Sequence, residues 1–211
     1  MQINLATRLT LARIPLGILT VLFLWTPFPL HAFYSFVCFV AAAATDYLDG
    51  HVARKYKQVT NLGIFLDPLI DKLTVLSVLI AFISQLITPE WIVILIFIRE
   101  ILVTSFRDYA AARGVAIPSV MSGKIKATLQ YLGILFGLLA LSCMEVGVPF
   151  GYVLMRFELF TLLLSIVIGY VGMFQIFQTH LAHVMQTDTP TVVSEHEAPV
   201  LKPKKKAHKK S

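Results

Sequence analysis

The chain has 211 residues, of which 57% are hydrophobic and 14% charged, and its formal net charge is +6 at pH 7. Soluble domains carry about 25% charged residues, and the mean hydropathy here is +0.76. These values exclude an ordinary soluble domain and predict an integral membrane protein with one membrane domain. The two cysteines form no spacing typical of a disulfide or zinc framework.

Six apolar runs are long enough to cross a bilayer, which takes about 20 residues of α-helix. Short separators with proline or polar residues divide them. The predicted spans are residues 10–28, 31–52, 63–88, 90–110, 124–145 and 155–182. We therefore expect an all-α, polytopic membrane protein whose six transmembrane helices occupy a membrane domain of residues 1–185.

The lysines and arginines predict the orientation of these helices, because cytoplasmic loops are enriched in both residue types. If the chain has six spans, the tail lies on the same side of the membrane as three groups of basic residues. These groups lie beside span one, between spans two and three, and between spans four and five. Only Arg156 lies on the opposite side. We therefore expect both termini in the cytoplasm and a multi-pass protein of the cell membrane, meaning the plasma or inner membrane.

The end of the second span and the start of the third carry the most specific pattern of the chain. It combines four aspartates with two glycines, an alanine and an arginine, and reads Asp46-x2-Asp49-Gly50-x2-Ala53-Arg54-x8-Gly63-x3-Asp67-x3-Asp71. An ionised aspartate inside a bilayer costs about 2.5–3.5 kcal/mol. Four aspartates in such apolar segments therefore need a compensating role.

The spacing of the aspartates indicates a metal site. The first two are three residues apart and the last two are four apart, so each pair shares one face of a helix. Carboxylate oxygens suit Mg²⁺ or Mn²⁺. Two such pairs facing each other can hold two ions about 3.5–4 Å apart, the arrangement used for phosphoryl displacement.

The segment 186–211 is polar and ends in a lysine-rich run. This composition predicts a disordered, basic cytoplasmic tail. Clustered lysines attract anionic lipid head groups by about 1 kcal/mol each. We therefore expect membrane lipids, and not nucleic acid, as partners of the tail.

The eight fixed positions of the aspartate pattern are similar to the signature of the CDP-alcohol phosphatidyltransferases. This resemblance implies six transmembrane helices, a cytoplasm-facing site, a divalent metal and a homodimer. It also implies transfer of a phosphatidyl group from CDP-diacylglycerol to an acceptor hydroxyl, with release of CMP. Further motifs resemble the phosphatidylglycerolphosphate synthase branch, whose acceptor is sn-glycerol 3-phosphate; they lie in residues 9–15, 63–72, 99–107 and 122–126. The chain departs from that branch at residues 4–7, where the usual proline is missing.

The resemblance assigns roles to the residues of the pattern. The expected metal ligands for Mg²⁺ or Mn²⁺, two ions in all, are Asp46, Asp49, Asp67 and Asp71. Asp71 is also the expected general base, which takes the proton of the acceptor hydroxyl. The residues expected to bind the CDP part of the donor are Thr10, Arg13, Gly50, Ala53 and Arg54.

The acceptor implied by the resemblance carries a dianionic phosphate, which needs basic donors near the metal. Arg107 near the end of span four, and Lys124 and Lys126 at the start of span five, are placed for that role. Arg99 and Glu100 lie deeper in span four, where charged groups are costly unless paired. Both a structural brace and a contact with substrate fit these two residues.

Two alternatives stay open. The same transfer can use another acceptor, namely phosphatidylglycerol, inositol phosphate or serine. A divalent-ion transporter would also use intramembrane carboxylates. The absence of a convincing inverted repeat, and the expected place of the aspartates at the membrane surface, favour the enzyme.

Overall fold

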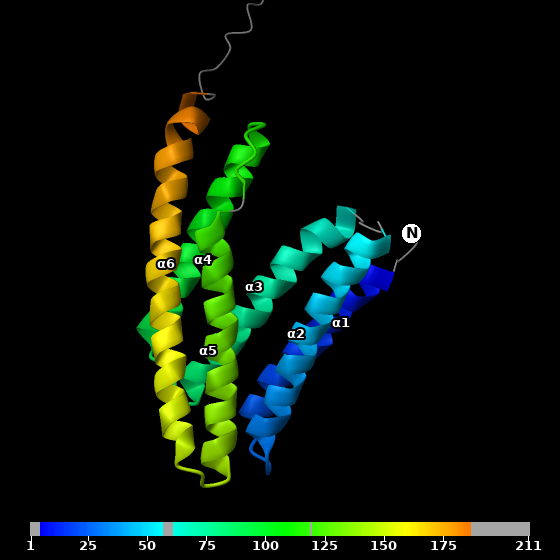
Figure 1. The fold of residues 1–211 in the computed structure, drawn as a ribbon, viewed down its shortest axis with the longest axis vertical. Helices are drawn as coiled ribbons and strands as arrows, with labels where there is room; N and C mark the ends of the chain where they lie inside the picture. The colour runs from blue at the N-terminus through cyan, green and yellow to red at the C-terminus, as the bar shows by residue number, and fades with distance from the viewer. Residues whose placement is uncertain (1–4, 57–60, 119, 187–211) are drawn as a thin grey trace, which may run out of the picture.

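The computed structural model describes residues 5–56, 61–118 and 120–186, and for residues 5–12, 46–56, 61–65, 67, 183 and 186 it describes the backbone alone. These residues form six α-helices and no strand, so the all-α prediction is confirmed for the described ranges (Figure 1). The helices are α1 (Leu5–Trp25), α2 (His31–Tyr56), α3 (Asn61–Ser84), α4 (Glu90–Ala112), α5 (Met121–Glu145) and α6 (Phe150–Gln186).

The helices differ from the predicted spans mainly at their ends. Helix α1 begins at Leu5, five residues before the predicted start, and α6 extends from Phe150 to Gln186 instead of 155–182. Hydropathy detects the apolar part of a helix, whereas backbone hydrogen bonding continues through polar turns on either side. Residue Gln186, where the predicted tail begins, is therefore the last residue of α6.

Two helices end at glycines in the left-handed backbone conformation. Gly114 follows α4 with φ +76° and Gly147 follows α5 with φ +74°. The next residues, Val115 and Val148, donate their N–H groups back into the last helical turn at 2.9 and 2.8 Å. This is the Schellman arrangement, which satisfies the terminal carbonyls of a helix.

The six helices form two groups joined by α3 (Figure 1). Helices α1 and α2 pack as one antiparallel pair, and α5 and α6 pack as another with α4 beside α6. Helix α3 runs obliquely between the groups and contacts α1, α4 and α5. Side chains that α3 carries are therefore placed to meet residues of both groups.

The main core draws most of its residues from α3, α4, α5 and α6 and also includes Leu24 of α1 and Phe39 of α2. Its fully buried apolar side chains include Phe82 of α3, Ile92 of α4, Ile134 of α5 and Leu162 of α6. Glycines on α5 permit the close approach of its neighbours: a Cβ at Gly137 would lie 2.5 Å from a ring carbon of Phe82. Small residues at such contacts are typical of helix packing in membranes.

Among the described residues, two helical stretches are long and apolar enough to cross a membrane, Met121–Glu145 and Phe150–Ala182. Shorter apolar stretches are Arg13–Trp25 and His31–Thr45. The wider expectation of six spans stays a prediction.

Candidate active site

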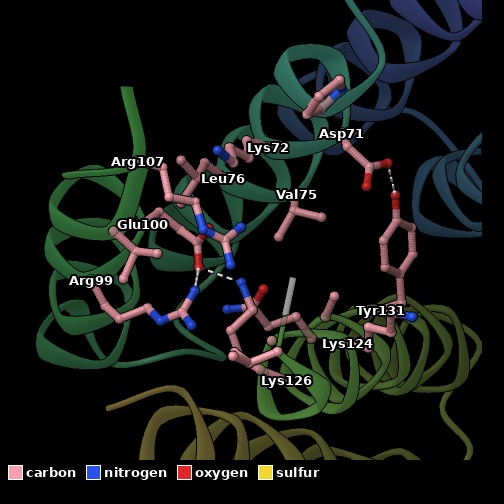
Figure 2. A pocket seen from close by; sticks show the side chains of 16 residues that line it. Asp71, Lys72, Val75, Leu76, Arg99, Glu100, Arg107, Lys124, Lys126 and Tyr131 are labelled. Atoms are coloured by element: carbon pink, nitrogen blue, oxygen red, sulfur yellow. Dashed lines mark hydrogen bonds and ion pairs between the residues drawn. The ribbon is translucent and has the colours of Figure 1, made fainter. Parts of the chain in front are cut away.

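A cavity of about 290 Å³ opens between α3, α4 and α5 (Figure 2). Five basic and two acidic residues take part in its lining. These charged residues are Asp71 and Lys72 of α3, Arg99, Glu100 and Arg107 of α4, and Lys124 and Lys126 of α5. The cavity therefore has an excess of positive charge, which favours an anionic ligand.

Helical periodicity explains why these side chains meet. Residues three, four or seven apart lie on one face of an α-helix. Asp71 and Val75 of α3 are four apart, and Glu100 and Arg107 of α4 are seven apart. Each helix therefore presents a polar group and apolar neighbours to the same cavity.

A buried ion network closes one side of the cavity (Figure 2). The Glu100 carboxylate accepts a hydrogen bond from Arg99 Nη1 at 3.0 Å and another, on the same oxygen, from Lys126 Nζ. Arg99 Nε also donates to the carbonyl of Gly169 on α6 at 3.1 Å. All three charged side chains belong to residues less than a tenth exposed. The network therefore ties α4, α5 and α6 together.

Arg99 and Glu100 thus pair with each other, and Lys126 joins them. This geometry agrees with the structural brace, one of the two roles that the sequence left open. Lys126, expected to bind the acceptor phosphate, already has a carboxylate partner.

The three residues expected at the acceptor phosphate all line this cavity. Arg107 Nη2 donates to the carbonyl of Pro118 at 3.4 Å, a long contact. Nearby, Lys72 Nζ donates to Thr104 Oγ1 at 2.5 Å. The structure brings Arg107, Lys124 and Lys126 together, and their role toward an acceptor stays a prediction.

Asp71 lies at the opposite side of the cavity from the Glu100 network (Figure 2). Its Oδ1 accepts a hydrogen bond from Tyr131 Oη at 2.6 Å and lies 3.8 Å from Arg13 Nη1. The Asp71 side chain is 41% exposed, whereas that of Arg13 is 5% exposed. The expected base and one expected CDP ligand are therefore neighbours.

The side chains of the other expected site residues lie outside the described part of the structure. They are Thr10, Asp46, Asp49, Gly50, Ala53, Arg54 and Asp67. The backbone places residues 46 and 49 on α2, and 67 on α3 with Asp71. Among the described side chains no group of three or more His, Cys, Asp or Glu lies together. A carboxylate donor set fits Mg²⁺ or Mn²⁺ chemically, and the metal site stays a prediction.

The sequence analysis did not single out Tyr131. It lies in the apolar run of α5, seven residues after Lys124, and therefore on the helix face that lines the cavity. The available sequence signal was a hydroxyl-bearing side chain on the same helix face as Lys124. Its hydrogen-bond partner, Asp71 on α3, is 60 residues away in the chain.

Comparison with known proteins places the chain in a family. A profile of the CDP-alcohol phosphatidyltransferases matches residues 3–175. Three similar curated proteins carry the name CDP-diacylglycerol–glycerol-3-phosphate 3-phosphatidyltransferase. The one from Bacillus subtilis (strain 168) is 37% identical over 143 residues, which cover 62% of this chain and 74% of the relative.

The other two relatives come from different bacteria. The Yersinia enterocolitica protein is 38% identical over 144 residues, covering 66% of this chain and 78% of the relative. The Wigglesworthia glossinidia brevipalpis protein is 37% identical over 139 residues, covering 64% and 76%. The profile match and these identities, together with the aspartate pattern, show that the chain belongs to the CDP-alcohol phosphatidyltransferase family.

Proposed function

We propose that the protein transfers the phosphatidyl group of CDP-diacylglycerol to sn-glycerol 3-phosphate, giving phosphatidylglycerol phosphate and CMP. Membership of the family and the names of the relatives support this reaction. The observation that carries the choice of acceptor is the basic cavity that has Asp71 on its wall.

The cavity suits a small phosphorylated acceptor. Its volume of about 290 Å³ lies at the lower end of ligand pockets, which begin near 300 Å³. Arg107 and Lys124 are the main candidates for the phosphate, because Lys126 is paired with Glu100. The guanidinium of Arg107 suits two phosphate oxygens at once. Serine has no phosphate for these donors, whereas inositol phosphate and phosphatidylglycerol both carry one and would compete as alternative acceptors.

These placements support the following course of the reaction. Asp71 takes the proton of the acceptor hydroxyl, whose oxygen attacks the β-phosphorus of CDP-diacylglycerol. The bond from this phosphorus to the oxygen bridging it to CMP breaks, and CMP leaves with both electrons. The buried guanidinium of Arg13, 3.8 Å from Asp71, would bind the nucleotide phosphates. Divalent metal, two Mg²⁺ or Mn²⁺ ions held by the four aspartates, would neutralise the charge on the diphosphate.

Substitution of Arg107 tests the acceptor. Arg107→Gln removes the charge but keeps a polar side chain. The loss of one charged hydrogen bond, about 1.5–3 kcal/mol, should raise the KM for sn-glycerol 3-phosphate about 10-fold or more. The KM for CDP-diacylglycerol should change little. Arg156→Gln is the matched control, because Arg156 is exposed on α6 and does not line the cavity. Equal rises in both KM values would contradict the assignment.

We also infer six spans with both termini in the cytoplasm. The shortest helix, α1, has 21 residues and is about 32 Å long, enough for a hydrocarbon core of about 30 Å. The active site would then face the cytoplasm of the plasma or inner membrane. Reporter fusions after residue 57 should report the cytoplasm, and an outside location would overturn this orientation.

A homodimer and lipid contacts of the tail 186–211 are carried over as further proposals. The homodimer follows from the family resemblance, and cross-linking of the protein in its native membrane would test it. The lipid contacts follow from the lysines of the tail. Removal of residues 187–211 should reduce binding to vesicles of anionic lipid without changing the turnover in detergent.

A further inference from the structure

Tyr131 joins three helices at the edge of the cavity. It belongs to α5, its hydroxyl reaches Asp71 on α3, and its ring packs on Phe39 of α2 with centroids 5.7 Å apart. Phe39 is fully buried. The ring therefore rests on a fixed surface, and the direction of the hydroxyl follows from that packing.

The contacts of Asp71 fall on one side of its carboxylate. Tyr131 Oη and Arg13 Nη1 both reach Oδ1, at 2.6 and 3.8 Å. Among the side chains that the structure describes, none forms a hydrogen bond or ion pair with Oδ2. Two partners on one oxygen determine the rotation of the carboxylate about its χ2 torsion, which is otherwise broad. The second oxygen keeps its acceptor capacity for another partner.

We propose that Tyr131 is a positioning residue for the transfer reaction. Its hydroxyl holds Asp71 through Oδ1, so that Oδ2 is presented in one orientation to the acceptor hydroxyl and to the divalent ion. The physical reason is that groups which hydrogen-bond to a metal ligand orient it, and their loss typically costs about 10–100-fold in metal affinity or activity. The kinetic part of this inference rests on the proposed function, whereas the metal-binding part does not.

The test removes one oxygen atom. Tyr131→Phe keeps the ring that packs on Phe39 and deletes the donor to Asp71. The matched control is Tyr170→Phe, because the Tyr170 hydroxyl donates to the Leu95 carbonyl at 3.1 Å, and Tyr170 does not line the cavity. Four quantities are measured on the purified protein in detergent: kcat and KM for sn-glycerol 3-phosphate, the Kd for Mn²⁺ from the electron paramagnetic resonance of free Mn²⁺, and Tm.

For Tyr131→Phe we expect kcat to fall about 10-fold and the Mn²⁺ Kd to rise about 10-fold, with the acceptor KM within about twofold of the wild type. Its Tm should fall no further than that of Tyr170→Phe, which should keep the wild-type kcat and Kd. An unchanged kcat and Kd in Tyr131→Phe would overturn the proposal. Equal losses of kcat in both variants, in step with Tm, would also overturn it, because they would show a purely structural role.

Failure of the proposed function would look different. A wild type that turns over no sn-glycerol 3-phosphate refutes that function, and the Mn²⁺ titrations of the wild type and both variants still decide the role of Tyr131. A Kd that rises only in Tyr131→Phe then supports the positioning role. Identical Kd values in all three proteins overturn it.

Discussion

Substitution of Glu100 by Gln tests the energetics of the buried ion network. Glu100 is 8% exposed and is the carboxylate partner of Arg99 and Lys126, which are each 6% exposed. Gln keeps the size of the side chain and a carbonyl oxygen, but it removes the negative charge. Two buried cations then face each other with no anion between them.

The expected cost is large because the partners stay buried. Breaking a buried ion pair by removing one member costs about 3–5 kcal/mol. For a chain of this size, 1 kcal/mol corresponds to about 2–4 °C in Tm, so the Tm of Glu100→Gln should fall by about 6–20 °C. The hydrogen bond from Arg99 to the Gly169 carbonyl remains and keeps part of the contact between α4 and α6.

The assay is thermal unfolding in detergent, followed by intrinsic fluorescence, for a double-mutant cycle. The second variant, Lys126→Met, removes a cation with little change of volume, and the double variant Glu100→Gln/Lys126→Met removes both charges. Because replacing a whole buried pair by uncharged groups is often close to neutral, the double variant should recover most of the lost stability. Additive losses, or a Glu100→Gln variant within 2 °C of the wild type, would refute the reasoning about this network.

Two further substitutions test the packing and the helix ends. Gly137→Ala should lower Tm by about 2–12 °C, because the added Cβ would lie 2.5 Å from a ring carbon of Phe82 and overpacking costs about 1–3 kcal/mol. Gly123→Ala on the same helix, with its nearest atom at 3.9 Å, should keep or raise Tm, and equal effects of the two changes would contradict the packing argument. The Glu145 carboxylate accepts the first two backbone N–H groups of α2 from His31 onward, both at 3.2 Å. Glu145→Gln should therefore lower Tm by about 2–4 °C, the equivalent of about 1 kcal/mol, and a wild-type Tm would contradict this role.

The helical fold could be predicted because its signals are local. Each helix contains a long apolar run, and proline or glycine marks the turns, as at Pro89 before α4 and Gly114 after it. The ends were less predictable, because polar turns such as residues 5–9 continue α1 beyond the apolar run. Hydropathy depends on the side chains, whereas the ends of a helix depend on backbone hydrogen bonds.

The sequence predicted which parts of the helices carry basic residues of the candidate site. It could not predict contacts between residues of different helices. The spacing of Arg107, Lys124 and Lys126 next to apolar runs indicated basic groups at one end of the helices, and all three line the cavity. The contact between Glu100 and Lys126 depends on how α4 packs against α5, 26 residues along the chain. No local pattern encodes such a register, so the sequence could not show that Lys126 has a carboxylate partner.

Tyr131 is a second residue whose contact with another helix could not be predicted from the sequence. Within its own helix it is one aromatic residue in an apolar run, which is most simply explained by packing. Its importance arises from the position of Asp71 on α3, which the oblique path of α3 brings beside α5 (Figure 1). The aspartate pattern indicated the chemistry, and the packing of the helices determines which neighbours orient it.

The most direct measurement is the release of CMP from CDP-diacylglycerol by the purified protein with Mg²⁺ or Mn²⁺. Glycerol 3-phosphate, inositol phosphate, phosphatidylglycerol and serine are compared as acceptors, with Asp71→Asn as the inactive variant and Asp108→Asn, exposed on α4, as its matched control. We predict metal-dependent release with sn-glycerol 3-phosphate alone, lost in Asp71→Asn and kept in Asp108→Asn. Release with another acceptor only would contradict the assigned substrate, and no metal-dependent release with any acceptor would contradict the reaction itself.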